Sequence, residues 1–376
     1  MNKKIALVIN VDWYFSLHWK ERAHLLKDKG NEIHVITNFT SLDIKDELIS
    51  EGFICHDLKV IRKSVNVFSE LITIKNLYRL IKDINPDIIH AITIKPNLYT
   101  GILNKLFWSK PIIYSITGLG AVYSSDKIKF RVLKRFISEI YKFVSTTNSK
   151  FIFENNDDFT TFSSLKILSD NGVVIKGAGI DLDKFKATPL KHTKRILFAA
   201  RLLKDKGFYQ LLSAKKILNR EGIEIELAVA GIIDNDVSSA IPLQEIEELH
   251  QNKEINWLGN VKKMPDLIET SDIVVLPTLY GEGVPRILIE AAACARPIIT
   301  SNIGGCREIV EHESNGFLVN PNDTEALANN IKLLLADEFW SESMGINGRK
   351  KVELEFSQEK VFKETLEIYN YLLSYK

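Results

Sequence analysis

Residues 277–297 read PTLYGEGVPRILIEAAACARP, and they directly follow a run rich in β-branched residues, Asp272–Leu276. The run predicts a buried strand, and the two glycines that come after it predict a loop. Pro285 stands where a helix would begin, and good helix formers fill Arg286–Cys294. The sequence therefore predicts a strand, a glycine-containing loop and a helix, in that order.

This arrangement favours a ligand that carries both negative charge and hydroxyl groups. The first amides of the helix lack partners and attract an anion such as a phosphate. Glu282 in the loop and Glu290 in the helix repel phosphate but accept hydrogen bonds from hydroxyls. A sugar nucleotide satisfies both demands. Taken alone, Glu290 is more typical of a solvated position on an amphipathic helix, because Glu is common on helices.

The segment Glu282–Glu290, EGVPRILIE, resembles the paired-glutamate motif of retaining family-4 glycosyltransferases. The resemblance extends over nearly the whole chain and is strongest to bacterial enzymes that extend undecaprenyl-diphosphate-linked oligosaccharides for O-antigen, capsule or protein glycosylation. It implies an α/β protein of the GT-B fold, in which two Rossmann-like, doubly wound parallel-sheet domains face each other across a cleft. It also implies a nucleotide-sugar donor, expected to be a UDP-N-acetylhexosamine or UDP-galactose, and a lipid-linked saccharide acceptor.

The domain organisation follows from length and from the alternation of strand and helix patterns. A chain of 376 residues is long enough for two cores. One βα series fills residues 1–180 and a second fills residues 191–356, separated by an aperiodic segment at residues 176–194. Residues 357–376 form a last helix that, in the family, returns to the N-terminal domain. We expect the first domain to bind the acceptor and the second to bind the donor.

Charge is unevenly distributed along the chain. Residues 1–190 hold 27 Lys and Arg against 20 Asp and Glu, whereas residues 191–376 hold 22 against 28. Basic and apolar residues interleave in Lys127–Lys150, which favours contact with an anionic membrane surface, although a packed helix with a solvated basic face fits the pattern too. A lipid partner is expected rather than nucleic acid.

The lack of a recognisable signal peptide and the spacing of the cysteines favour a location in the cytoplasm. The apolar run in Ile5–Asn10 is too short for a signal peptide and predicts the first strand. No segment has the length of a transmembrane helix, and the three cysteines are widely separated, as in a reducing compartment. We therefore expect peripheral association with the inner face of the cytoplasmic membrane.

Candidate donor-site residues gather in the second half. Arg201 follows a predicted strand, and Lys206 stands at the start of the next helix, where the helix dipole disfavours a cation unless an anion lies nearby. In the family, a matching Arg and Lys hold the donor diphosphate, so Glu282, Arg201 and Lys206 are the predicted catalytic residues. The remaining predicted donor contacts are Glu290, Gly283, Val284, Pro285, Arg286, Gly259 and Val261. No metal and no cofactor are expected.

Acceptor-site candidates in the first half are less well defined. The segment Val11–Ser16 follows the first strand as a predicted loop, aromatic and without the glycines that many GT-B enzymes carry there. The candidate acceptor contacts are His18, His90, Lys95, Thr117 and Gly118. His90 fits a core histidine as well as a site residue, Lys95 is a candidate for an acceptor phosphate, and no catalytic histidine is assigned.

The predicted reaction is transfer of a sugar from a nucleotide diphosphate to a hydroxyl with retained anomeric configuration. Glu282 would orient the donor sugar and Glu290 the ribose. Two alternatives remain open, a nonhydrolysing UDP-sugar epimerase and a non-catalytic sugar-nucleotide-binding protein. A NAD-dependent dehydrogenase is disfavoured, because no G-x-G-x-x-G follows the first strand.

Overall fold

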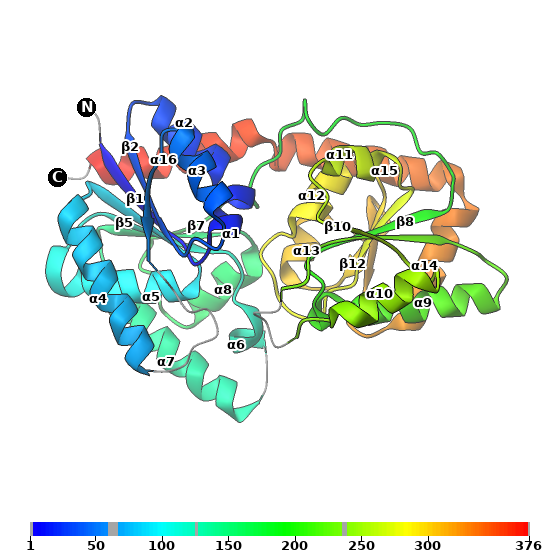
Figure 1. Cartoon of the computed structure of the whole chain (residues 1–376), viewed down its shortest axis with the longest axis horizontal. Coiled ribbons are helices and arrows are strands. Elements are labelled where there is room, and N and C mark those ends of the chain that lie inside the picture. The colour runs from blue at the N-terminus through cyan, green and yellow to red at the C-terminus, as the bar shows by residue number, and fades with distance from the viewer. Residues whose placement is uncertain (1–2, 59–66, 125–126, 235–238, 375–376) are drawn as a thin grey trace. The chain divides into compact units, whose positions relative to one another are not determined.

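The computed structural model describes residues 3–58, 67–124, 127–234 and 239–374. The chain divides into two compact units, shown in Figure 1, each built on one parallel sheet. Unit 1 comprises Met1–Ala178 together with Val361–Lys376, and unit 2 comprises Gly179–Lys360. The predicted α/β class with two parallel sheets is confirmed.

Unit 1 contains a seven-stranded parallel sheet in the order β3-β2-β1-β4-β5-β6-β7. Its strands are β1 (Lys4–Val8), β2 (Glu32–Thr37), β3 (Ile54–Asp57), β4 (Ile88–Ile92), β5 (Ile112–Ile116), β6 (Ser149–Phe153) and β7 (Gly172–Val174). The order reverses between β1 and β4, and in open α/β sheets the carboxyl ends of strands at such a point form the usual ligand site.

Helices cover both faces of this sheet. They are α1 (Asp12–His18), α2 (Lys20–Asp28), α3 (Leu42–Ser50), α4 (Val67–Ile84), α5 (Ile94–Leu103), the π-helical turn η1 (Asn104–Trp108), α6 (Gly120–Ser124), α7 (Ile128–Val144), α8 (Asn156–Ser164) and α16 (Gln358–Ser374). Side chains alternate along β1, so that Ala6 and Val8 pack with α4, α5, α7 and α8, while Ile5 and Leu7 pack with α1, α2, α3 and α16.

Unit 2 contains a six-stranded parallel sheet in the order β10-β9-β8-β11-β12-β13. Its strands are β8 (Arg195–Ala199), β9 (Glu226–Ala230), β10 (Asn256–Gly259), β11 (Ile273–Leu276), β12 (Ile298–Ser301) and β13 (Gly316–Val319). Its helical segments are the 3₁₀ turn η2 (Lys204–Lys206), α9 (Phe208–Arg220), α10 (Leu243–Gln251), α11 (Met264–Glu269), α12 (Arg286–Ala293), α13 (Gly304–Ile309), α14 (Thr324–Ala336) and α15 (Glu338–Glu355). Here the order reverses between β8 and β11, the two strands that precede the predicted catalytic residues.

The prediction of a loop after the first strand was wrong, because Asp12–His18 forms helix α1. The carboxylate of Asp12 is fully buried and accepts hydrogen bonds from the backbone amides of Thr40 (2.7 Å) and Ser41 (3.0 Å). These partners lie almost thirty residues away, so a local pattern could not reveal them. His18, expected just inside the next helix, is instead the last residue of α1.

The segment between the two βα series contains no helix or strand from Ile175 to Lys194, where the sequence pattern is aperiodic. The last helix, α16, contributes Val361, Phe362 and Tyr369 to the core of unit 1. The final part of the chain therefore completes the core of the N-terminal unit rather than that of unit 2.

Candidate functional site

The predicted strand, loop and helix at Asp272–Cys294 are present as β11, an irregular segment and α12. Pro285 is the residue that precedes the helix, with φ −62° and ψ 121°, so the helix begins one residue later than its expected first-turn position. Nearly all of α12 is buried. The loop that carries Glu282 is thus fixed between a core strand and a core helix.

Glu282 is held by side chains from two segments. Thr278 donates a hydrogen bond from Oγ1 to Oε1 of Glu282 over 2.6 Å, and Lys206 forms an ion pair with Oε2. Both charged side chains are largely buried, with 14% and 11% of their surfaces exposed. Burial alone would lower the pKa of Lys206, but the carboxylate of Glu282 and the neighbouring Tyr280 outweigh it and raise that pKa. Lys206 is therefore a cation at neutral pH.

The loops after β8 and β11 approach each other closely enough to require a glycine. Gly207 has φ +80°, and a Cβ atom there would lie 1.9 Å from the carbonyl oxygen of Pro277. The amide of Leu279 donates to the carbonyl of Asp205 over 2.8 Å, which ties the two loops together. The structure therefore brings Lys206 and Glu282 together, as the sequence predicted, although 76 residues separate them.

Arg201 lies at the carboxyl end of β8 and adds a second cation. Its Nη1 atom donates to Oδ2 of Asp234 over 2.9 Å, and its charge opposes the protonation of Lys206. Two cations of the same loop thus lie near one another, each beside a carboxylate. A diphosphate is the kind of ligand that such a pair would hold, with Arg201 able to form two parallel hydrogen bonds.

Glu290 is a buried residue of α12 and pairs within that helix. Arg286 donates from Nε to Oε1 of Glu290 over 2.7 Å, at a spacing of four residues. Burial raises the pKa of Glu290, while Arg286 and Lys184 act in the opposite direction. Arg286 and Glu290, which were both predicted to contact the donor, therefore form an ion pair with each other. Val284 packs its side chain into the core of unit 2, which leaves its backbone as the part available to a ligand.

Gly259 and Val261 lie farther along the same edge of the sheet. Gly259 ends β10 with φ +62°, and its carbonyl accepts the amide of Gly231 over 2.8 Å. A Cβ atom on Gly231 would lie 1.8 Å from the carbonyl oxygen of Ala200, next to Arg201. Backbone contacts therefore connect the end of β10 to the end of β8, with β9 between them.

Two residues of this site were missed by sequence reasoning. Thr278 lies in residues 277–297. The feature that could have identified it is its hydroxyl, two residues after the strand and four residues before Glu282. Asp234 follows β9 and reaches Arg201 only through the fold, so no local signal marks it. Both neighbours set the positions of the predicted catalytic side chains.

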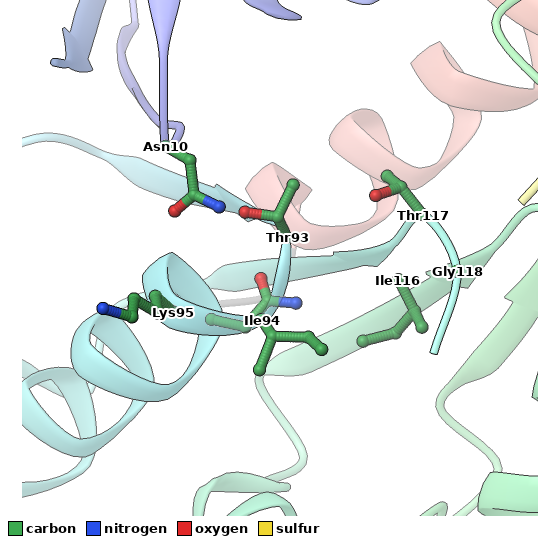
Figure 2. A pocket seen from close by; sticks show the side chains of 8 residues that line it. Asn10, Thr93, Ile94, Lys95, Ile116, Thr117 and Gly118 are labelled. Atoms are coloured by element: carbon green, nitrogen blue, oxygen red, sulfur yellow. The ribbon is translucent and has the colours of Figure 1, made fainter. Parts of the chain in front are cut away.

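Unit 1 contains a cavity of about 320 Å³ at the carboxyl ends of β1, β4 and β5 (Figure 2). It is lined by Asn10, Thr93, Ile94, Lys95, Asn97, Ile116, Thr117 and Gly118. Three predicted acceptor residues, Lys95, Thr117 and Gly118, thus share one cavity at the switch point of the sheet. Lys95 donates from Nζ to Oε1 of Glu70 in α4 over 2.7 Å.

The two histidines predicted on the acceptor side do not line this cavity. His90 is fully buried, and its ring nitrogens lie 2.6 Å from Oη of Tyr369 and 2.7 Å from Oγ of Ser115. Burial, aided by Arg22, lowers the pKa of His90 to about 3. The site assignment of His90 was wrong, and its alternative, a core histidine with satisfied partners, is correct. His18 packs against Tyr14, with ring centroids 4.4 Å apart and the ring planes tilted by 33°.

Helix α7 presents apolar residues to solvent. Ile128, Val132 and Phe136 recur at four-residue spacing and are 73%, 66% and 64% exposed. Ile137 and Tyr141 of the same helix are buried in the core.

No helix within the described parts of the chain is both long and apolar enough to cross a bilayer. Across those same parts, no three His, Cys, Asp or Glu side chains converge as metal ligands, and metal independence stays a prediction.

Comparisons with known proteins agree with this architecture. Residues 4–155 match the family described as Glycosyl transferase 4-like, and residues 180–351 match Glycosyl transferases group 1. The chain is 26% identical to the capsular polysaccharide biosynthesis glycosyltransferase CapM of Staphylococcus aureus, over 99% of this chain and 98% of CapM.

A second relative is the N,N'-diacetylbacillosaminyl-diphospho-undecaprenol alpha-1,3-N-acetylgalactosaminyltransferase of Campylobacter jejuni, 26% identical over 92% of each chain. The structure of HepE from Anabaena in complex with UDP and glucose matches with a TM-score of 0.80 and 17% identity, over 98% of this chain and 100% of HepE. The predicted GT-B fold and the family resemblance are thereby confirmed. The chain belongs to the family-4 glycosyltransferases of the GT-B fold.

Proposed function

We propose that this glycosyltransferase transfers a hexose or N-acetylhexosamine from a UDP-sugar to a lipid-linked saccharide, with retention, in the assembly of a surface polysaccharide or glycan. The observation that carries the proposal is the cluster of Lys206, Glu282 and Thr278 beside Arg201. The name of the Campylobacter relative, with its diphospho-undecaprenol acceptor, and the UDP and glucose bound by HepE support the two substrate classes.

Arg201 and Lys206 would bind the donor diphosphate. Breaking the bond between the sugar C1 atom and the phosphate oxygen leaves a full negative charge on the leaving diphosphate. Fixed cations close to that oxygen stabilise the transition state more than the ground state. Because Lys206 is already held by Glu282, little reorganisation is needed when the donor arrives.

Glu282 would orient the donor sugar rather than attack it. Its two carboxylate oxygens are engaged by Thr278 and Lys206, an arrangement that suits a hydrogen-bond acceptor for sugar hydroxyls. Retention then follows from attack on the face that the leaving group vacates. The acceptor oxygen bonds to C1, the C1–phosphate bond breaks, and the acceptor proton passes to the departing phosphate oxygen. Glu290 would hold the ribose hydroxyls through the carboxylate oxygen other than the one that Arg286 binds.

The acceptor would bind through unit 1. The exposed stripe of Ile128, Val132 and Phe136 on α7 lies among the basic residues Lys129, Arg131, Lys134 and Arg135, which supports contact with an anionic membrane. A variant with serine at the three stripe positions should lose co-sedimentation with vesicles containing anionic lipid. Phe339→Ser, which changes an 84% exposed residue of α15, is the control and should keep it. Equal loss of binding in both variants would count against α7.

The transfer reaction is tested by UDP release from a panel of UDP-sugars, with and without a polyprenyl-diphosphate-linked saccharide. The proposal expects release that depends on the acceptor, an α-linked product from an α-linked donor, and a fall of at least 100-fold in Glu282→Gln. Interconversion of UDP-sugars without release would indicate the epimerase alternative. Donor affinity without turnover on any acceptor would indicate a binding protein.

A further inference from the structure

Tyr280 is an aromatic residue of the donor-side loop and stands two residues before Glu282. The ammonium of Lys206 lies over its ring, 5.5 Å from the ring centroid, where a cation is attracted to the face of a tyrosine. The backbone beside the ring is tied down too, because the amide of Leu279 donates to the carbonyl of Asp205 over 2.8 Å. The ring is therefore held beside a cation that we expect to bind the diphosphate.

The hydroxyl of Tyr280 lies in the field of four charged side chains. They are the cations Lys206 and Arg201 and the carboxylates of Glu282 and Asp205. Burial is the strongest influence and raises the pKa of Tyr280. The hydroxyl therefore keeps its proton at neutral pH and can donate a hydrogen bond.

This hydroxyl is open to a ligand. It makes no hydrogen bond with any residue that the structure describes, and it is not among the polar atoms that are closed to solvent. The Tyr280 side chain is partly exposed. Gly281 follows directly, and a Cβ atom there would meet nothing within 4 Å, so the loop borders open space at this point.

The neighbouring side chains indicate which ligand group the hydroxyl would meet. Both carboxylate oxygens of Glu282 are already engaged, one by Thr278 and the other by Lys206. A diphosphate held by Lys206 and Arg201 presents oxygens that only accept hydrogen bonds, and a neutral hydroxyl beside them is a suitable donor. A sugar hydroxyl can pair with a phenol as well, but the two cations do not attract it to this position.

We propose that the hydroxyl of Tyr280 donates a hydrogen bond to a diphosphate oxygen of the bound donor and keeps this bond as the sugar departs. The assignment rests on the proposed transferase function and adds an uncharged group to Arg201 and Lys206. Negative charge grows on the diphosphate as the bond to the sugar C1 atom breaks, so the hydrogen bond is stronger in the transition state than in the ground state.

The test compares the full-length wild type with Tyr280→Phe, which removes only the hydroxyl and keeps the ring beside Lys206. The affinity for UDP, measured by isothermal titration calorimetry, should fall about three- to tenfold. The affinity for uridine, measured by ligand-observed NMR, should not change. The unfolding midpoint should not fall, because the hydroxyl makes no hydrogen bond to a described residue. With the UDP-sugar and acceptor found active in the panel above, kcat should fall about tenfold.

The matched control is Tyr209→Phe in α9 of the same unit. Tyr209 donates from Oη to Oε2 of Glu245 over 3.0 Å, away from the donor-side loop. This variant should have a lower unfolding midpoint, because a hydrogen bond is lost. Its affinity for UDP should equal that of the wild type.

Three outcomes would overturn the inference. They are equal UDP affinity in Tyr280→Phe and the wild type, equal weakening of UDP and uridine binding, and weaker binding of UDP-N-acetylglucosamine with unchanged binding of UDP, which would place the hydroxyl on the sugar. Failure of UDP to bind the wild type would reject the proposed function, whereas normal UDP affinity that Tyr280→Phe retains rejects the assignment of Tyr280 alone.

Discussion

The residue at the centre of the proposed donor site is Glu282, and the side chains of Lys206 and Thr278 hold its carboxylate in place. Lys206 neutralises one carboxylate oxygen and Thr278 donates to the other. A buried carboxylate without such partners would be costly, because its charge would be left uncompensated. If Glu282 orients the donor as we propose, Thr278 would act as a positioning residue through this hydrogen bond.

Replacement of Thr278 by valine should lower kcat for sugar transfer by about tenfold, because Glu282 loses the bond that fixes one oxygen. The free energy of unfolding should fall by about 1 kcal/mol, the usual value for one buried hydrogen bond. Steady-state kinetics and urea denaturation measure the two effects.

The control for this prediction is Thr300→Val. Thr300 is equally buried and donates from Oγ1 to the carbonyl of Leu276 over 2.7 Å, and its Oγ1 also lies 3.1 Å from Sγ of Cys306, so its hydroxyl is not the one that bonds to Glu282. It should show the same loss of stability with little loss of kcat. Equal loss of kcat in the two variants would mean that Thr278 has only a structural role.

His90 should make the stability of the protein depend on pH. Its pKa is about 3 in the folded protein and near 6.5 when unfolded, so the unfolded chain takes up the proton first as the pH falls. The free energy of unfolding should therefore decrease by about 1.4 kcal/mol for each pH unit below 6.5. Urea denaturation between pH 7 and pH 5 should show a shallower fall for His90→Gln than for the wild type. Parallel curves would contradict the buried neutral state.

At the scale of elements, the donor-side site depends on how closely loops at the carboxyl ends of neighbouring strands can approach. A Cβ atom on Gly305, in α13, would lie 1.4 Å from the carbonyl oxygen of Gly283. A Cβ atom on Gly207, directly after η2, would likewise clash with the carbonyl oxygen of Pro277. These glycines set the distance between the loop of Glu282 and the segments that surround it.

Gly305→Ala should therefore displace the Glu282 loop, with a loss of about 1–3 kcal/mol in unfolding free energy and a clear loss of transfer activity. The control is Gly281→Ala in the same loop, because a Cβ atom there would meet nothing within 4 Å. Thermal unfolding compares the two. A stability for Gly305→Ala equal to that of Gly281→Ala would show that the close approach is not required.

Sequence patterns predicted the elements whose signals are local. The β-branched run before Pro277 and the helix formers after Pro285 are sufficient for β11 and α12. Helix α1 was missed, because its aromatic residues have modest helix propensity and its buried Asp12 is satisfied by Thr40 and Ser41 from a distant loop. Periodicity carries no information about such partners.

The residues of the candidate site could likewise be predicted only where a local signal marks them. Arg201, Lys206 and Glu282 each follow a strand, and the sheet order places their loops at one edge. The contact of their neighbour Asp234 with Arg201 depends on side-chain geometry that no spacing encodes. His90 carried an ambiguous pattern, and only its contacts with Tyr369 and Ser115 decide between a core and a site histidine.

At the scale of the whole molecule, both units place their candidate sites at the carboxyl edge of a parallel sheet, next to the point where strand order reverses. The two sites differ in chemistry. Unit 2 provides cations and carboxylates suited to a nucleotide diphosphate and a sugar, while the cavity of unit 1 is lined by neutral side chains and by Lys95, which Glu70 pairs. This division matches the transfer from a charged donor to a saccharide acceptor that we propose.

The most direct test of the central claim is the affinity for UDP of the wild type, Arg201→Met and Arg195→Met, measured by isothermal titration calorimetry. Arg195 begins the same strand β8 at its amino end and pairs with Glu226 over 3.2 Å, so it is a matched control remote from the carboxyl edge. The account predicts that Arg201→Met weakens UDP binding at least tenfold and that Arg195→Met leaves it unchanged. Unchanged affinity in Arg201→Met, or equal weakening in both variants, would contradict it.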